Sequence, residues 1–344
     1  MDAFLADFIL RDAERIVHQT DLSPLKGKTV LLTGASGLIG HYVLASMKVA
    51  AEKGFAPQKI ALVMKREQPD YFGLLCNGLS LEHYEGDITD VNFLSGLPSA
   101  DVIIHAAGYG QPGRFMEDQI KTLKLNTIST FALLGKLNPQ GKFLFLSSSE
   151  VYSGLENPPY RESQIGTTTP EHTRSCYIEG KRCGEAIVNA YRQRGVDAKS
   201  VRICLAYGPG TKKDDARALN SFIQKGIIQR VIALMDSGEA KRAYIYVTDA
   251  VRMMWDVLLY GLEGTYNVGG ASRTTIVDLA RLIAKTLGVS AQIPEGKGQA
   301  IAGAPADVFL NMEKMEKEFK KNQYVDIETG IANTVLWQKH LYVS

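Results

Sequence analysis

The first 204 residues alternate between short apolar stretches and longer amphipathic stretches. The apolar stretches predict strands at residues 29–33, 59–64, 81–85, 102–105, 142–147 and 198–204. The amphipathic stretches predict helices at residues 3–18, 37–53, 122–137 and 177–194. Strands that are apolar throughout and alternate with helices of about ten or more residues are typical of a parallel sheet covered on both faces. We therefore expect an α/β protein with a doubly wound parallel sheet.

The pattern becomes less regular after residue 207. Helices are predicted at residues 217–225, 248–260 and 275–287, and a strand at residues 231–234. Thr275 lies near the start of the last of these helices and Gly288 follows its end, which are positions that these residue types favour. Because no linker-like sequence separates the two halves, we expect this part of the chain to form a smaller lobe interleaved with the sheet.

Composition narrows the class of protein. The chain has 344 residues, of which 45% are hydrophobic and 22% charged, and its formal net charge is +2. Scattered basic residues give no electrostatic basis for a nucleic-acid or membrane partner. The longest apolar runs are far shorter than the roughly 20 residues of a spanning helix, and residues 1–27 lack the profile of a signal peptide. The four cysteines have no metal-ligand spacing, so we expect free thiols, no metal and a cytoplasmic protein.

A glycine-rich loop follows the first predicted strand of the sheet. Gly34, Gly37 and Gly40 form a GxxGxxG pattern between this strand and a helix. The first glycine permits a tight turn, the second lets backbone N–H groups approach a pyrophosphate, and the third allows close helix–strand packing. The phosphates then meet the positive end of the helix. We therefore expect a Rossmann-type dinucleotide site formed by Gly34, Ser36, Gly37, Leu38, Ile39 and Gly40.

The residues after the second strand leave the choice between NAD and NADP open. An acidic residue at this strand end usually binds the ribose hydroxyls and selects NAD. Here the strand ends in Met64 and is followed by Lys65 and Arg66, which either meet the 2′-phosphate of NADP or are solvated residues at a strand end. Asp87, followed by Ile88, is a candidate for accepting a hydrogen bond from the adenine amino group; its alternative role is to cap a loop.

Tyr177 and Lys181 form a YxxxK pair. On a helix, this spacing places both side chains on one face. A nearby ammonium group stabilises phenolate, so we expect Tyr177 to have a lowered pKa that suits a general base. The preceding strand ends in three serines, residues 147–149, and ligands of parallel sheets bind at the carboxyl ends of strands. These serines either hydrogen-bond a hydroxyl that is being oxidised or cap the next turn.

Taken in order, these motifs resemble the extended short-chain dehydrogenase/reductase family of nucleotide-sugar epimerases, dehydratases and decarboxylases. The resemblance covers about residues 28–340. Further motifs that carry it are Ile104-His-Ala-Ala107, Lys124-Leu-Asn-Thr127, Tyr207-Gly-Pro-Gly210, Arg242-Ala-Tyr-Ile-Tyr-Val-Thr-Asp249 and Gly264-Thr-Tyr-Asn-Val-Gly-Gly270. It implies NAD as the cofactor, with NADP as the alternative, and it adds Ala106, Ala107, Gly108 and Asn126 to the cofactor site.

We divide the chain accordingly into an N-terminal helical extension (residues 1–27), an NAD(P)-binding Rossmann domain (28–204) and a part that mainly binds a nucleotide sugar (205–344). The extension is expected to cap the core or to contact a partner subunit. The resemblance also implies a homodimer, formed through the helices predicted at 123–137 and 177–194.

Several stretches are most similar to UDP-glucuronate decarboxylases, the UDP-xylose synthases and their relatives. Residues 174–182 closely match their active-site helix, and residues 120–127 match the segment after their substrate loop. Ser148-Ser149-Glu150 fits their Thr-Ser-Glu, where 4,6-dehydratases usually carry an Asp-Glu pair. The resemblance implies a UDP-linked substrate, contacted by Gln111, Ser149, Arg182, Arg217 and Arg242, with Arg217 at the diphosphate.

The reaction implied is oxidation of a sugar C4 hydroxyl, with Tyr177 as base, Lys181 lowering its pKa and Ser148 bonding the same oxygen. In a glucuronate, the 4-ketone makes C6 the carboxyl group of a β-keto acid, which can lose CO₂, while the cofactor carries the redox chemistry. Glu150 and Arg242 would then position the carboxylate and handle protons near C5. Alternatively, these two residues form an ordinary ion pair.

Departures from the family pattern leave other functions open. Leu205 stands where relatives usually carry Asn, the acidic NAD-selecting residue is missing, and the loop at residues 108–115, which contains Phe115, differs from the Ser-Pro-rich decarboxylase version. A 4-epimerase or a 4,6-dehydratase would use the same Tyr177–Lys181 pair, although Ser149 in place of Asp argues against dehydration. A sensor or scaffold that binds NAD(P) without catalysis is a third hypothesis.

Overall fold

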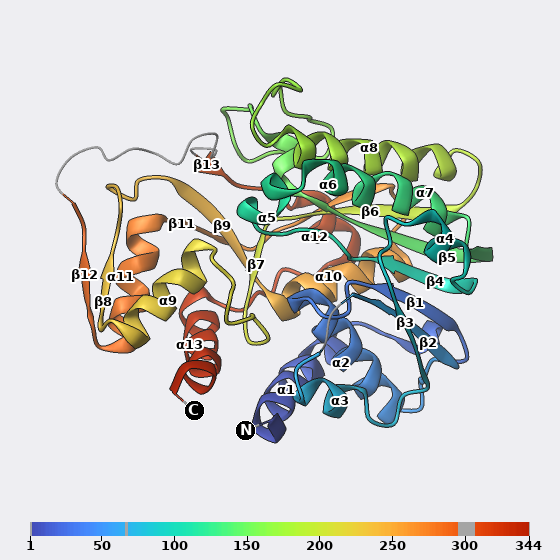
Figure 1. Ribbon diagram of the computed structural model, residues 1–344, viewed down its shortest axis with the longest axis horizontal. Coiled ribbons are helices and arrows are strands. Elements are labelled where there is room, and N and C mark those ends of the chain that lie inside the picture. Colours follow the sequence, from blue (N-terminus) through green and yellow to red (C-terminus); the bar gives the residue numbers. More distant parts are fainter. Residues whose placement is uncertain (1, 66–67, 295–306, 344) are drawn as a thin grey trace.

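The computed structural model describes residues 2–65, 68–294 and 307–343. The strands of the central sheet are β1 (Thr29–Thr33), β2 (Lys59–Met64), β3 (Leu81–Glu85), β4 (Ala100–His105), β5 (Leu137–Ser148), β6 (Asp197–Ile203) and β10 (Thr265–Val268). They are all parallel, in the order β10-β6-β5-β4-β1-β2-β3. The chain leaves β1 toward one edge of the sheet and returns to β4 toward the other (Figure 1), so the expected doubly wound Rossmann-type sheet is confirmed.

Helices cover both faces of this sheet (Figure 1). One face carries α1 (Asp2–Gln19), α2 (Leu38–Glu52), α3 (Tyr71–Cys76) and α10 (Val247–Tyr260), and the other carries α4 (Val91–Ser95), α6 (Gln119–Asn126), α7 (Ile128–Leu134) and α8 (Ser175–Arg192). Successive residues of a strand point to opposite faces, so Val30 and Leu32 join the core beneath the first set of helices and Leu31 joins the core beneath the second. Burial on both faces explains why the strands are apolar throughout.

The C-terminal elements form a smaller lobe beside the sheet, on the left in Figure 1. Its members are β7 (Leu205–Tyr207), α9 (Ala218–Ile228), β8 (Val231–Ala233), β9 (Lys241–Tyr246), β11 (Ser272–Thr275), α11 (Ile276–Leu287), β12 (Ser290–Gln292), β13 (Asp307–Val308) and α13 (Ile327–Val343). Strand β9 pairs with β7, β11 and β13, and β12 pairs with β8. Since α10 and β10 come from the same part of the chain but join the central sheet and its helical layer, the two halves are interleaved.

Four short elements complete the fold. They are η1 (Ser23–Leu25), α5 (Pro112–Glu117), η2 (Ser149–Tyr152) and α12 (Glu313–Phe319). Of these, α5 and η2 follow β4 and β5, and the carboxyl ends of these neighbouring strands are where a parallel sheet binds its ligands.

Most predicted helices and strands are confirmed to within a few residues. The helix α11, for example, begins after Thr275, whose hydroxyl accepts a hydrogen bond from the Asp278 N–H at 3.0 Å. It ends at Gly288, which adopts the left-handed conformation with φ of 67°. Both ends therefore follow the residue preferences that located them in the sequence.

The single helix predicted at residues 122–137 is wrong. The chain forms α6 and α7 instead, with a break at Thr127 (φ −115°, ψ −73°), and residue 137 already begins β5. The side chains of Asn126 and Thr127 hydrogen-bond the carbonyl groups of Thr122 and Leu123, each at 2.8 Å. Such bonds to the preceding turn bend helices, and a periodicity argument does not detect them.

The N-terminal helix α1 caps the core. Leu5, Ile9 and Ile16 are buried in the cluster that also contains residues of α2 and α10. Asp12 joins the two halves of the molecule, because its Oδ2 accepts hydrogen bonds from Tyr42 of α2 at 2.8 Å and from Tyr246 of β9 at 2.7 Å. Burial raises the pKa of Asp12 to about 6, although both tyrosines oppose the shift.

Candidate active site

The glycine loop joins β1 to α2 and leaves no room for larger residues at two positions. A Cβ at Gly34 would lie 2.7 Å from the backbone of Ala106, and one at Gly40 would lie 2.4 Å from the Gly34 carbonyl oxygen. Gly37 directly precedes α2, and no side chain of the described residues caps this end of the helix. The first N–H groups of α2 are therefore available to a phosphate, so the loop fits a dinucleotide.

The remaining backbone of this site comes from the end of β4. The Ala107 N–H donates to the Thr33 hydroxyl at 3.1 Å, which ties the end of β4 to that of β1. Gly108 follows, where an added Cβ would lie 3.6 Å from Lys181 Nζ. Asn126 Oδ1 is buried without a hydrogen-bond partner among the described residues. A buried acceptor without a donor is costly, which favours a bound ligand at this place.

Lys65 and Lys121 both bind Asp87. Lys65 Nζ donates to Asp87 Oδ2 at 2.8 Å, and Lys121 donates to the same oxygen. Partial burial disfavours the charged carboxylate, but the hydrogen bonds from Lys121 and Lys65 hold the pKa of Asp87 well below its usual value. Asp87 also caps its own loop, since its Oδ1 accepts the Thr89 N–H at 3.0 Å. Arg66 lies outside the described residues.

The other residues expected at the cofactor flank these groups. Ser36, Leu38 and Ile39 adjoin Gly37 and are partly buried, whereas Ile88 is buried next to Asp87.

Tyr177, Lys181 and Ser148 come together where α8 passes the end of β5. Tyr177 is hydrogen-bonded to Ser148. The Lys181 Nζ lies 5.7 Å from the centroid of the Tyr177 ring and donates to the Leu146 carbonyl group at 2.6 Å. The three side chains therefore form one constellation at the carboxyl end of a central strand.

The expectation of a lowered Tyr177 pKa is wrong. Burial raises the pKa of Tyr177 to about 12, even though the hydrogen bond to Ser148 opposes this shift. Burial also lowers the pKa of Lys181 to about 7. One physical cause explains both, because removal from water disfavours the charged form of each group. Part of this burial comes from Phe115 of α5, whose ring stacks on that of Tyr177 with the centroids 4.5 Å apart.

Glu150 stands in η2, directly after the serines of β5. Its ion pair is with Arg174, whose Nη2 donates to Glu150 Oε1 at 2.5 Å. Arg242, the partner considered from the sequence, instead donates to the Lys241 carbonyl group at 2.7 Å. It is nevertheless close enough to act on Glu150: burial raises the pKa of Glu150, and the charges of Arg174 and Arg242 oppose the shift.

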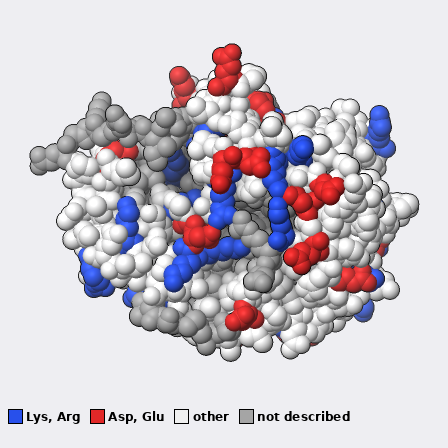
Figure 2. Space-filling model, in the orientation of Figure 1, with Lys and Arg blue, Asp and Glu red and all other residues white. Residues whose placement is uncertain are grey.

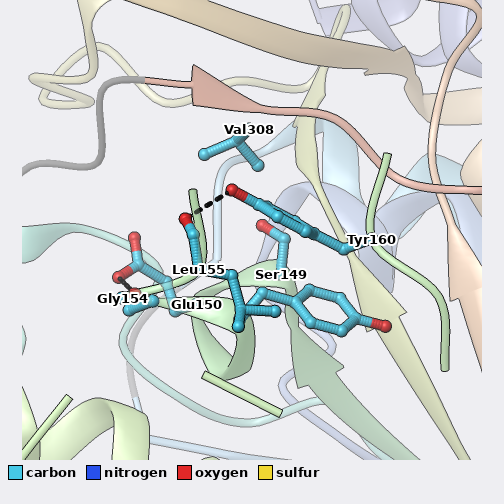
Figure 3. A pocket seen from close by; sticks show the side chains of 8 residues that line it. Ser149, Glu150, Gly154, Leu155, Tyr160 and Val308 are labelled. Atoms are coloured by element: carbon cyan, nitrogen blue, oxygen red, sulfur yellow. Dashed lines mark hydrogen bonds between the residues drawn. The ribbon is translucent and has the colours of Figure 1, made fainter. Parts of the chain in front are cut away.

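A small cavity opens beside Glu150 (Figure 3). Its walls are formed by Ser149, Glu150, Tyr152, Ser153, Gly154, Leu155, Tyr160 and Val308. The Tyr160 hydroxyl donates to the Leu155 carbonyl group at 2.8 Å and so closes one side of it (Figure 3). Ser149 and Glu150 therefore line the same cavity.

The other residues expected to contact substrate already have protein partners. Arg217 is bound by Asp215, with its Nη2 at 2.6 Å from Oδ2. Gln111 Oε1 accepts a hydrogen bond from the Ala216 N–H at 3.4 Å, which connects the segment before α5 to the loop that carries Arg217. Arg182 donates to the Val151 carbonyl group at 2.9 Å, so it ties α8 to η2 rather than joining the group around Tyr177.

Arg174, Phe115 and Asp215 were not singled out for these roles by sequence reasoning. Arg174 stands three residues before Tyr177, directly before α8, and this closeness in sequence was the available signal. The contacts of Phe115 and Asp215 depend on loops, for which local sequence carries no comparable signal.

Basic side chains gather near the middle of one face of the molecule. Figure 2 shows them in the region where Figure 1 places α5 and β7, with Asp and Glu side chains directly beside them.

Within residues 2–65, 68–294 and 307–343, no group of three or more His, Cys, Asp and Glu side chains is placed to hold a metal ion. Over the same part of the chain, no helix has the length and apolar character needed to cross a membrane.

Comparisons with known proteins agree with this fold. Residues 30–269 match the NAD dependent epimerase/dehydratase family. UDP-glucuronic acid decarboxylase 1 of Xenopus tropicalis is 30% identical over 274 residues, which cover 79% of this chain but only 63% of the relative's own length.

Among solved structures, the dTDP-glucose 4,6-dehydratase DesIV of Streptomyces venezuelae, with NAD bound, superimposes with a TM-score of 0.76 at 22% identity, covering 91% of this chain and 97% of that one. MoeE5 in complex with UDP-glucuronic acid and NAD gives a TM-score of 0.73 at 20% identity, covering 91% and 99%. At these identities the two structures establish the shared fold.

Proposed function

The chain belongs to the NAD-dependent epimerase/dehydratase family, and from this membership we propose that it is a nucleotide-sugar-modifying enzyme of the UDP-glucuronate decarboxylase type that uses NAD. One observation carries the proposal: Glu150 is paired with Arg174 and lies within reach of the charge of Arg242, in the constellation that contains Tyr177. This arrangement suits a sugar that carries a carboxylate. The NAD bound to DesIV and MoeE5, and the fit of the glycine loop, support the cofactor.

The residues that would hold NAD are those of the glycine loop, the end of β4 and Lys65 with Asp87. When bound, NAD accepts a hydride and returns it, and its pyridinium charge favours the tyrosine phenolate. Tyr177 Oη takes the proton of the sugar C4 hydroxyl, and Ser148 hydrogen-bonds the same oxygen. Protonated Lys181 favours the phenolate by its charge, and its bond to Leu146 fixes its position.

The C4 ketone of a uronate makes its carboxyl group that of a β-keto acid. Loss of CO₂ leaves an enolate that the ketone stabilises, and a proton must then reach C5. Glu150, with a pKa raised by burial, is suited to exchange that proton, and the guanidinium of Arg242 is suited to receive the carboxylate. Burial of Tyr177 limits the access of bulk water to its hydroxyl group.

We also propose that the chain forms a homodimer through α6, α7 and α8. Exposed apolar side chains on α6 and α7 support this arrangement, including Ile120 (70% exposed) and Phe131 (53% exposed). A cytoplasmic location is supported by the four free cysteines, because free thiols persist in a reducing compartment.

The test is incubation of the purified chain with NAD and UDP-glucuronate, followed by mass spectrometry of the nucleotide sugars. Decarboxylation predicts a product lighter by one CO₂; an isobaric product would identify an epimerase, and loss of water from UDP-glucose or dTDP-glucose would identify a dehydratase. Tyr177→Phe should abolish conversion while NAD binding survives, and Tyr191→Phe, on the same helix, serves as the control. An active Tyr177→Phe variant would refute the assignment of the base.

A further inference from the structure

Arg174 contacts the two groups to which the chemistry has been assigned. It directly precedes α8 and is buried, with 8% of its surface exposed. Its Nη2 holds Glu150 Oε1 at 2.5 Å, and its guanidinium carbon lies 5.3 Å from the centroid of the Phe115 ring. That ring stacks on Tyr177 at an interplanar angle of 11°. Arg174 thus contacts Glu150 directly and is connected to Tyr177 through the Phe115 ring.

We propose that Arg174 is a positioning residue that holds the Glu150 carboxylate beside Tyr177 and offsets the negative charge that the two groups share during the reaction. The inference rests on the proposed function, because it matters only if Tyr177 loses its proton while Glu150 is near. Arg174 itself is assigned no contact with the substrate.

The charges around the two groups explain why such an offset is needed. Glu150 is faced by Arg174, Arg242, His172 and Ser153, and Tyr177 is faced by Ser148, Glu150, Arg174 and Arg217. Burial is the largest influence on both and raises both pKa values. Glu150 raises the pKa of Tyr177 further, since two anions close together repel each other, whereas Arg174 lowers the pKa of both groups. Arg174 therefore lets the two groups ionise in one buried site.

The chemistry of the guanidinium explains why this residue is an arginine. A planar guanidinium can donate to a carboxylate and also lie against an aromatic ring, whereas an ammonium is a compact point charge. We expect Arg174→Lys to keep the electrostatic effect but to lose orientation, and Arg174→Met to lose both. The two variants thus separate charge from geometry.

The first measurement titrates Glu150 directly and needs no turnover. The chain is labelled with carboxyl-¹³C glutamate, and the Glu150 signal is assigned by its absence from Glu150→Gln. Arg174→Met should raise the pKa of Glu150 by at least about one unit, and Arg174→Lys should leave it within about half a unit of the wild type. Arg194→Met is the matched control, because Arg194 is exposed and follows the far end of α8, about 30 Å away.

The second measurement is the pH dependence of conversion of UDP-glucuronate. In Arg174→Met, the ascending limb of the pH profile of kcat/KM should move to higher pH by at least about one unit. At a pH below that limb, kcat/KM should then be about tenfold lower than in the wild type, while the Kd for NAD stays within about twofold. In a Glu150→Gln background, Arg174→Met should lower the residual kcat/KM by much less than tenfold, because the carboxylate through which Arg174 acts is gone.

A Glu150 titration that does not move in Arg174→Met, with only the melting temperature lowered, would overturn the inference and leave Arg174 a structural residue. Failure of the proposed function has a different signature. In that case wild-type protein converts no nucleotide sugar, while the glutamate titration still decides whether Arg174 controls Glu150.

Discussion

Two glycines of the same loop should respond to alanine in opposite ways. At Gly40 the new methyl group would meet backbone atoms, 2.4 Å from the Gly34 carbonyl oxygen and 2.6 Å from the Ala35 Cα. At Gly37 the nearest atom lies at 3.4 Å, which is an ordinary contact. Gly40→Ala therefore tests packing of helix on strand, and Gly37→Ala tests whether a ligand needs the space above the loop.

The size of the packing effect follows from how far the backbone must move. Relief of the contact at Gly40 requires the loop and α2 to separate by about 1 Å, and overpacking of this kind costs about 3 kcal/mol. This outweighs the gain of up to about 1 kcal/mol from alanine in a helix. We expect the melting temperature of Gly40→Ala to fall by roughly 5 °C.

The assay combines thermal denaturation without ligand and calorimetric titration with NAD. Gly37→Ala should melt within about 1 °C of wild type but bind NAD at least about tenfold more weakly, because its methyl group occupies the path of the pyrophosphate. Gly73→Ala is the control, since no heavy atom of the described residues, apart from its chain neighbours, lies within 4 Å of the added Cβ. Unchanged NAD affinity in Gly37→Ala would refute the placement of the pyrophosphate on this loop.

Three further predictions concern stability. Because folding raises the pKa of Asp12, the folded protein holds this proton more tightly than the unfolded chain, and roughly 3 kcal/mol of the stability present below about pH 4 is lost as the pH rises to about 6. In urea denaturation at pH 4 to 8, Asp12→Asn should not show this loss. Parallel pH profiles of the variant and the wild type would contradict the cause. Thr275→Ala removes the cap of α11 and should lower the free energy of unfolding by about 1 kcal/mol in the same assay, with no effect on NAD binding. An unchanged denaturation midpoint would mean that water replaces the hydroxyl group. Arg202→Met leaves the largely buried Glu185 without its ion-pair partner, which lies at 2.7 Å in the wild type, and should cost about 3 kcal/mol in the same assay. A milder loss would indicate that Glu185 becomes protonated or hydrated.

Much of the architecture could be predicted from the sequence, because its cause is local. The bounds predicted for β1, β2 and β3 agree with those of the structure, since a strand buried on both faces must be apolar throughout. The position of the glycine loop and the shared face of Tyr177 and Lys181 follow from the periods of strand and helix. The break between α6 and α7 was missed because it arises from side-chain bonds to the backbone.

The electrostatic state of the candidate site could not be predicted in the same way. The sequence correctly identified an ammonium close to a phenol, yet the pKa of Tyr177 is raised, because the depth of burial depends on Phe115 folding over it from another element. Likewise Glu150 was a candidate from its position after β5, but its partner is Arg174 rather than Arg242. Which two charged groups form a pair depends on distances of a few ångströms, and the loops that carry the groups determine these distances.

The sequence by itself determined which segments form strands and helices, because residue type, spacing and period are local properties. For the same reason it could predict where a dinucleotide binds and which residues carry proton chemistry. Only the tertiary structure decided that β10 returns to the central sheet, that Asp87 is held by two lysines and that Phe115 covers Tyr177. These features join residues far apart in the chain, and their energies depend on burial and geometry. Neither exists until the whole chain has packed.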